Sequence, residues 1–292
     1  MKIAAVIAVL QENQYVIEHQ GWPWKVAHQI NQLLLAVSFL TRLPVPSDLY
    51  YRADVMHSAL RYFPIVGWLL AGILALFWLA LSPLLGSLPT LCLMLGVSLL
   101  LTGALHEDGL ADCFDGFYGG FDVERKLTIM KDSRLGTYGS SALFVALMTK
   151  LSLWWSLSYQ SELLIGALLV AYPLSRTLAV SHAQDLIYVS APGKSKSDPL
   201  AKPLSMPMLS QILTLGAAGL ILLPWTAWLV VIPTALVLRW LLKHWMHKHI
   251  RGFTGDSLGA AQQIQELGIY ASLLLAANQG WLDTVSIAGV LL

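Results

Sequence analysis

Long apolar segments separated by short links restrict the folds open to this chain. Six of them, and a weaker seventh that contains Asp283, follow one another: 62–81, 87–105, 139–158, 162–181, 208–224, 226–243 and 268–292. A helix of about 20 apolar residues crosses the core of a bilayer. A spanning segment must satisfy its own backbone hydrogen bonds, and no strand-like alternation competes with a helix here. We therefore predict an all-α, polytopic membrane helical bundle with about 6–7 spanning helices.

The charge content agrees with a membrane protein. Only 12% of the 292 residues are charged and 56% are hydrophobic, whereas soluble proteins carry about 25% charged residues. The net charge of +1 gives no reason to expect binding to nucleic acid. The apolar composition indicates the lipid bilayer as the expected partner. The two cysteines, Cys92 and Cys113, form no C-x-x-C or Cys/His pattern that would indicate zinc or a disulfide framework.

The N-terminal segment stands apart from the predicted bundle. Residues 1–28 form an extension without an assignable role, and its apolar start lacks a small-residue cleavage site, so we interpret it as uncleaved. Residues 29–41 are apolar but too short to span, which indicates an interfacial or re-entrant segment. We predict that residues 29–292 form a single membrane-embedded domain.

Basic residues in the links lie on one side of the predicted bundle only. The links on the other side contain no Lys or Arg, against thirteen on the first side: Arg42, Arg52, Arg61, Arg125, Lys126, Lys131, Arg134, Lys194, Lys196, Lys202, Lys243, Lys248 and Arg251. Cytoplasmic loops carry the excess of basic residues in membrane proteins. The pattern predicts that the polar links, and any site within them, face the cytoplasm.

The polar stretch 106–139 carries the most distinctive spacing in the chain. Asp108, Asp112 and Asp115 are separated by four and three residues, so on a helix they share one face with Cβ atoms about 5–6 Å apart. Two carboxylates that close repel by roughly 3 kcal/mol at an effective dielectric constant of 20. Oxygen ligands favour a hard cation such as Mg²⁺, which is usually held by one or two carboxylates and completed by substrate phosphates. Glycine at 109 and 116 costs about 1 kcal/mol each in a helix, which suggests that a substrate approaches the backbone there.

Two further polar segments on the same side carry candidate phosphate ligands. The first holds Lys131, Asp132, Ser133 and Arg134, and Arg in particular suits paired contacts to phosphate. The second, 251–260, is rich in glycine and could bind an anion through its backbone N–H groups. Its candidate residues are Arg251, Gly255 and Ser257 for phosphate, and Asp256 as a further metal ligand.

Structural alternatives exist for each of these features. The three acids could be a solvated helix start, the basic residues ordinary cytoplasmic charge, and 251–260 a capped turn. His106 could be a base or a polar neighbour. Lys150 and Arg176 fall within predicted spans, where they either face the bundle interior or extend to the membrane surface.

Four motifs together resemble the cobalamin synthase family. They are F-L-T-R-L-P-V-P at 39–46, H-E-D-G-L-A-D-C-F-D-G at 106–116, M-K-D-S-R-L-G-T-Y-G at 130–139 and T-G-D-S-L-G-A at 254–260. The resemblance implies an adenosylcobinamide-GDP ribazoletransferase activity, which joins adenosylcobinamide-GDP to α-ribazole or its 5′-phosphate and releases GMP. It further implies a requirement for Mg²⁺, a late step of cobalamin biosynthesis, and a bacterial or archaeal inner membrane.

The family chemistry assigns roles to the candidate residues. Asp108, Asp112 and Asp115, with Asp256, would bind Mg²⁺, and either Asp112 or Asp115 would accept the proton of the attacking ribose hydroxyl. The basic residues and the 251–260 loop would orient phosphates. Partners beyond the two substrates stay open and include a second copy of the chain or other membrane enzymes of the pathway.

Two other functions compete with this interpretation. A CDP-alcohol phosphotransferase of lipid synthesis also uses membrane helices, an acidic D-G motif and Mg²⁺, but it expects Arg where this chain has Asp112. A cation transporter would place its acids near mid-membrane, whereas here the acids gather in one polar stretch.

Overall fold

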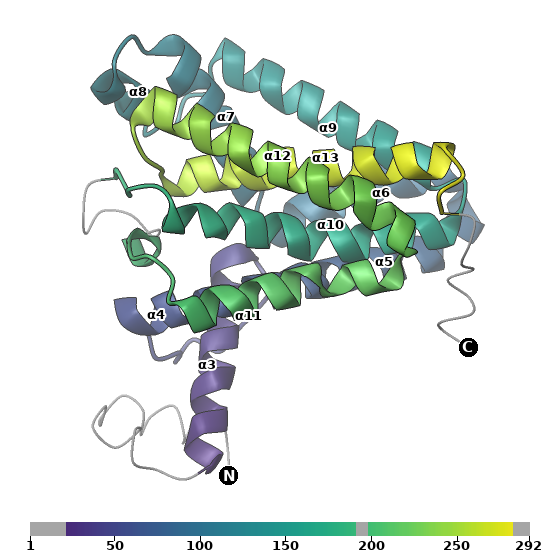
Figure 1. Ribbon diagram of the computed structural model, residues 1–292, viewed down its shortest axis with the longest axis horizontal. Helices are drawn as coiled ribbons and strands as arrows, with labels where there is room; N and C mark the ends of the chain where they lie inside the picture. Colours follow the sequence, from purple (N-terminus) through teal and green to yellow (C-terminus); the bar gives the residue numbers. More distant parts are fainter. Residues whose placement is uncertain (1–21, 191–197, 283–292) are drawn as a thin grey trace.

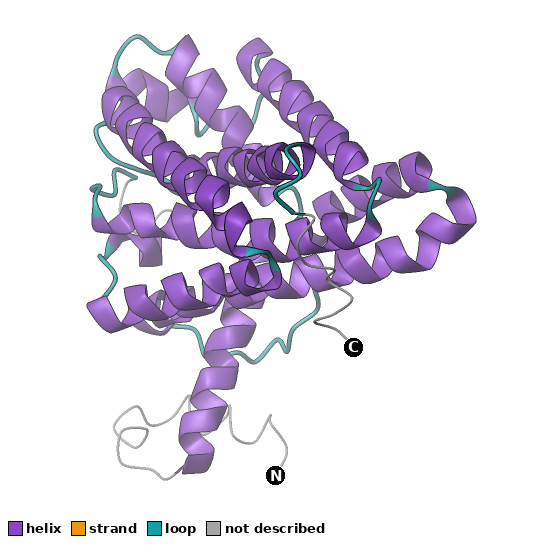
Figure 2. Ribbon diagram, turned by 45° about the vertical axis from the view of Figure 1, so that its right-hand side comes forward, coloured by secondary structure: helices purple, strands orange, loops and turns teal. Residues whose placement is uncertain are grey.

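A computed structural model describes residues 22–190 and 198–282, and helices account for most of them (Figure 2). Within these ranges the extended structure is limited to an isolated bridge between Tyr188 and Phe253. The all-α class is therefore confirmed. Most of the 1–28 extension, residues 191–197 and the end of the chain from 283 onward, with Asp283, lie outside the described residues.

The described helices build one bundle around a central helix, α10. Nearly every side chain of α10 is buried, as expected for a helix that is apolar on all sides. It packs against α5, α13 and α11. The helices are α3 (Trp22–Leu40), α4 (Ala53–Ala59), α5 (Phe63–Leu85), α6 (Ser87–Thr102), α7 (Leu105–Gly119), α8 (Val123–Ile129), α9 (Thr137–Leu157), α10 (Ser161–Ser181), α11 (Met206–Ala217), α12 (Trp225–Ile250) and α13 (Gly255–Asn278).

Four helical stretches of the described chain are long and apolar enough to cross a membrane. They are Ala53–Leu85, Thr137–Leu157, Ser161–Gln184 and Trp225–Ile250, and a fifth would result if α6 and α7 were counted as one span bent by 86°. These four agree with the spans predicted at 62–81, 139–158, 162–181 and 226–243. The chain is thus a multi-pass helical membrane protein, and its described residues supply four or five candidate spans, compared with the 6–7 expected for the whole chain.

The three remaining predicted spans are shorter or more polar than the sequence indicated. Segment 87–105 is interrupted because Gly103 and Ala104 adopt left-handed backbone angles (φ 62° and 54°) and end α6. With 16 residues, α6 is only about 24 Å long. Segment 208–224 changes from α11 to a 3₁₀ turn at Ala218–Leu222. Segment 268–292 lies partly in the second half of α13, whose polar first half does not suit a span, and partly beyond the described residues.

Polar elements collect at one end of the bundle. In Figure 1, α4, α8 and the start of α13 lie at the left, whereas the α5–α6 and α9–α10 links and the end of α13 lie at the right. Helix α3, which includes the segment expected to be interfacial, runs crosswise to the other long helices (Figures 1 and 2). Helix α7 turns sharply away from α6 and carries four acidic residues, so we treat it as lying outside the spans.

Candidate functional site

Helix α7 and the first turns of α13 cross in close contact at the polar end. A Cβ atom built on Gly109 would lie only 2.6 Å from the carbonyl oxygen of Asp256. Across the same contact, a Cβ atom on Gly259 would lie 3.3 Å from the Cα atom of His106. Small residues at a helix crossing allow the backbones to approach. The glycine at 109, expected to admit a substrate, therefore admits a second helix.

This crossing brings carboxylates from two helices into one neighbourhood. Asp108 is exposed and Asp112 half-buried on α7, and Asp256 lies in the first turn of α13. Burial and the charges of Asp108, Asp256 and Asp115 raise the pKa of Asp112 to about 7. Burial and the charge of Asp108 also raise the pKa of Asp256 to about 6, and nearby Lys131 opposes this rise. Carboxylates that repel each other this strongly favour a bound cation.

Asp115 has a different surrounding from the other acids. Its two carboxylate oxygens accept hydrogen bonds from the backbone N–H groups of Gly136 (2.7 Å) and Gly139 (2.9 Å). An anion at this position also suits the positive N-terminal end of α9. A Cβ atom on either glycine would collide with the carboxylate. Asp115 therefore holds the loop between α8 and α9 in place against α7.

The donor set was tested for its fit to Mg²⁺. Over residues 22–190 and 198–282, no group of three His, Cys, Asp or Glu side chains forms a ready-made metal site. Mg²⁺ does not require one, because it usually takes one or two carboxylates and completes its shell with water and substrate phosphates. Asp108, Asp112 and Asp256 offer only oxygen donors, and a cation would relieve their repulsion. The residues fit Mg²⁺ that binds together with a phosphate-bearing substrate.

The predicted phosphate ligands fall into an exposed and a buried group. Arg134 forms an ion pair with Asp132 (Nη2 to Oδ2, 2.6 Å) and remains largely exposed. Ser257 is buried, and its hydroxyl accepts the N–H of Thr254 at 2.9 Å in a capping box that begins α13. Ser257 thus shapes the loop, while other members of the set lie at the surface. Exposed residues are Lys131, Ser133, Arg134 and Arg251, and Gly255 is half-buried.

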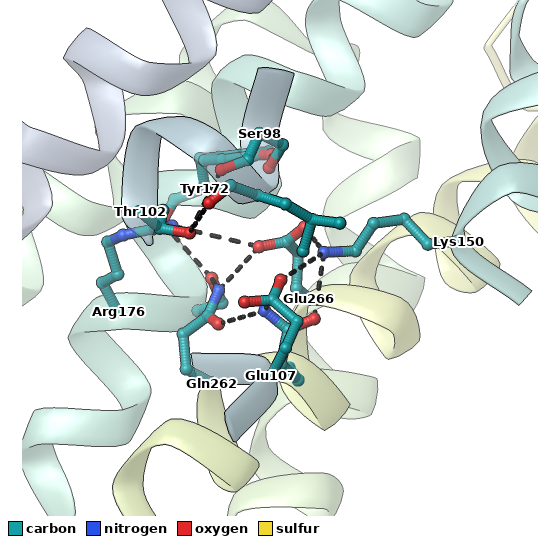
Figure 3. Close-up of polar contacts among 11 residues, drawn as sticks. Ser98, Thr102, Glu107, Lys150, Tyr172, Arg176, Gln262 and Glu266 are labelled. Atoms are coloured by element: carbon teal, nitrogen blue, oxygen red, sulfur yellow. Dashed lines mark hydrogen bonds and ion pairs between the residues drawn. The ribbon is translucent and has the colours of Figure 1, made fainter. Parts of the chain in front are cut away.

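Four charged side chains are buried together between α7, α9, α10 and α13 (Figure 3). Lys150 Nζ lies 3.1 Å from Glu266 Oε1 and 3.8 Å from Glu107 Oε1. Arg176 Nη1 lies 3.9 Å from Glu266 Oε2 and donates to the carbonyl oxygen of Tyr172 at 2.9 Å. Two acids balance two bases, as buried charges require. Lys150 and Arg176 therefore face the bundle interior and do not extend to the membrane surface.

Two glutamines of α13 complete this buried network. Gln262 donates to Glu266 at 2.6 Å. Gln263 donates to Glu107 at 3.1 Å and accepts from Lys150 at 2.9 Å. Because Glu107 belongs to α7 and both glutamines to α13, the network fixes the two helices that supply the carboxylates. We therefore assign these side chains a positioning role.

A cavity of about 320 Å³ adjoins the carboxylates. Asp256, His106 and Arg176 line it together with side chains from α3, α5 and α10. His106 is only 5% exposed, and its burial keeps the pKa of the imidazole well below the usual value. The imidazole is therefore neutral.

Comparisons with known proteins agree with the motifs. The family model described as cobalamin-5-phosphate synthase matches residues 32–274. A protein of Pseudoalteromonas atlantica named adenosylcobinamide-GDP ribazoletransferase is 53% identical over 249 residues, which cover 85% of this chain and 92% of the relative. Proteins of the same name from Vibrio cholerae (44% identical; 85% and 94% covered) and Shewanella amazonensis (42%; 86% and 97%) are also similar. No solved structure matches.

Proposed function

Because the chain belongs to the cobalamin-5-phosphate synthase family, we propose that it is an adenosylcobinamide-GDP ribazoletransferase. In this reaction a ribose hydroxyl of α-ribazole, or of its 5′-phosphate, attacks the phosphoryl group next to cobinamide, and GMP leaves. The product is adenosylcobalamin or its 5′-phosphate. The observation that carries the assignment of the site is the crossing of α7 and α13, which gathers carboxylates from both helices at the polar end. Membership of this family argues against the lipid phosphotransferase and the transporter.

Mg²⁺ is the proposed cofactor, held by Asp108, Asp112 and Asp256. When bound, it neutralises negative charge on the pyrophosphate and on the departing GMP. The three carboxylates come from two helices that the buried network holds rigidly, so the protein positions the charge before substrate arrives. Preorganised charge of this kind supplies much of the rate enhancement in phosphoryl transfer.

The chain's own residues divide the remaining tasks. Lys131, Arg134 and Arg251 are exposed at the same end and supply positive charge to the phosphates. Asp112 is the better placed proton acceptor for the ribose hydroxyl, because both oxygens of Asp115 already accept backbone hydrogen bonds. Asp115 instead keeps the loop with Lys131 and Arg134 against the site.

We propose that this polar end faces the cytoplasm of a bacterial or archaeal cell. The links predicted from the sequence on this side hold thirteen Lys and Arg residues, against none in the links predicted on the other. Such an asymmetry sets the orientation of membrane helices. Nucleotide-bearing substrates would then reach the site from the compartment in which they are made.

Turnover by purified protein in detergent tests the proposal. Adenosylcobinamide-GDP, α-ribazole 5′-phosphate and Mg²⁺ are supplied, with an EDTA control, and GMP and the joined corrinoid are quantified. We expect both products in equal amounts, and their loss with EDTA and in Asp112→Asn. GMP without a joined corrinoid would indicate a hydrolase instead. No turnover by folded protein would reject the assignment.

A further inference from the structure

The cavity beside Asp256 has a largely apolar lining, to which His106, Arg176 and Gln262 add polar side chains. Phe39, Phe63 and Leu258 contribute apolar side chains from α3, α5 and α13, and Ala179 adds a small one from α10. Its volume of about 320 Å³ lies at the lower limit of small-molecule pockets, which span about 300–1,000 Å³. The cavity therefore suits one compact apolar ring system.

Two of the polar residues that line the cavity, Arg176 and His106, each have a buried nitrogen without a partner among the described residues. Arg176 is 3% exposed, and among the described residues its Nε has no hydrogen-bond partner. The rest of its guanidinium is held in place, since Nη1 donates to Tyr172 and the group lies 4.9 Å from the centre of the Tyr172 ring. His106 Nδ1 is likewise unpartnered within the described chain. A buried donor without an acceptor is destabilising, and an acceptor on a ligand would remove this cost.

We propose that this cavity binds the benzimidazole base of α-ribazole, with the guanidinium of Arg176 donating to the free ring nitrogen. The inference rests on the proposed function, because that function supplies the riboside. Benzimidazole is a flat apolar bicycle whose one unsubstituted nitrogen is an acceptor, which matches a largely apolar lining that includes a guanidinium donor. Asp256 lines the same cavity, so a base seated there leaves its ribose beside the carboxylates.

The other ring systems of the two substrates fit this cavity less well. Guanine carries several donors and acceptors around its edge, and those that face Phe39, Phe63 and Leu258 would lack partners. The corrin macrocycle is much larger than one compact ring system. The cavity thus distinguishes the riboside from the nucleotide-bearing substrate and would set the preference among lower bases.

Binding of ligand analogues tests the hydrogen bond without any mutation. Titration calorimetry on the full-length protein in detergent, without the GDP substrate, would compare α-ribazole with its indole analogue, in which carbon replaces the free ring nitrogen. A hydrogen bond to a charged donor is worth about 1.5–3 kcal/mol, so the indole analogue should bind about tenfold or more weakly. Equal binding of the two would overturn the proposal.

Cavity variants test the location of the base. In Ala179→Leu, the added carbon atoms should raise the KM for the dimethylbenzimidazole riboside about tenfold or more, and raise that for unsubstituted benzimidazole riboside less. The KM for adenosylcobinamide-GDP should stay unchanged. Ala80→Leu, at an exposed position of α5, is the matched control and should alter none of the three. A rise in the KM for the GDP substrate instead would place guanine in the cavity and reject the proposal.

An enlarged cavity provides a second test if Ala179→Leu fails to fold. Phe39→Ala should increase the relative kcat/KM for a riboside with a larger, naphthalene-fused base. No change in that ratio would contradict the inference while leaving the transferase assignment intact. Absence of any joined corrinoid with the wild-type protein would instead reject the proposed function itself.

Discussion

Replacing Lys150 by methionine should lower the stability of the folded bundle. Two buried carboxylates would then face only one buried cation. Lys150 and Glu266 are each 1% exposed, with Nζ and Oε1 3.1 Å apart. Methionine keeps the approximate length of the side chain and removes the charge. Glu107 and Glu266 would then share only Arg176, and the buried network would carry a net negative charge.

The expected loss can be estimated from the burial of this pair. Removing one partner of a fully buried ion pair costs about 3–5 kcal/mol. At about 2–4 °C per kcal/mol for a large domain, the melting temperature should fall by roughly 6–20 °C. Glu266→Gln added to Lys150→Met restores the balance of one acid against one base. The double variant should therefore lose less stability than the sum of the two single losses, by about 0.5–3 kcal/mol.

Thermal unfolding in one detergent, monitored by tryptophan fluorescence, measures these differences. Lys248→Met is the matched control, because Lys248 is an exposed lysine near the end of α12, and its melting temperature should change little. If the melting temperature of Lys150→Met lies within about 2 °C of the wild type, well short of the expected loss of about 6–20 °C, or if the single losses add without coupling, the buried network does not hold α7, α9 and α13 together.

Three other perturbations have defined outcomes. Gly109→Ala should lower kcat/KM about 100-fold, because the added methyl group pushes the backbone of α13 away, whereas Gly72→Ala, which meets nothing within 4 Å, should be active. Because the pKa of Asp112 is raised to about 7, the folded state binds more protons than the unfolded state between about pH 4 and 7. Without metal, the contribution of Asp112 to the free energy of unfolding should therefore fall as the pH rises through that range. The melting-temperature gain from Mg²⁺ should accordingly be larger at pH 8 than at pH 5.5, and equal gains would contradict a carboxylate site. In intact cells, a membrane-impermeant maleimide should label Tyr159→Cys, on the side whose predicted links contain no Lys or Arg, but not Ser133→Cys; the reverse pattern would invert the proposed orientation.

The sequence predicted the acidic face of α7 better than its surroundings. The spacing of Asp108 and Asp112 is a local property of one helix, so it could be recognised without a structure. The separate task of Asp115 could not, because it depends on N–H groups more than 20 residues away along the chain. The motif around Asp256 placed this residue among the candidate metal ligands. The close contact between Gly109 and the backbone of Asp256 explains why it lies near the acids of α7.

The buried ion network illustrates what one-dimensional patterns miss. Lys150 and Arg176 stood out as charges within apolar spans, but their partners did not. Glu107 belonged to the acidic stretch, and Glu266 lay in the link between the predicted spans 226–243 and 268–292. Pairing between them is decided by the packing of four helices, which hydropathy does not encode. The same limit explains the span count, since left-handed residues at a bend leave average hydropathy unchanged.

Binding of Mn²⁺ as a spectroscopic substitute for Mg²⁺ tests the central claim most directly, namely that carboxylates from α7 and α13 form one metal site. Electron paramagnetic resonance would measure bound Mn²⁺ in the presence of adenosylcobinamide-GDP. We expect Asp112→Asn and Asp256→Asn each to weaken binding at least tenfold (about 1.4 kcal/mol), whereas Glu124→Gln, an exposed acid on α8, should bind as the wild type does. Wild-type affinity in Asp256→Asn would show that α13 supplies no ligand and would contradict the account.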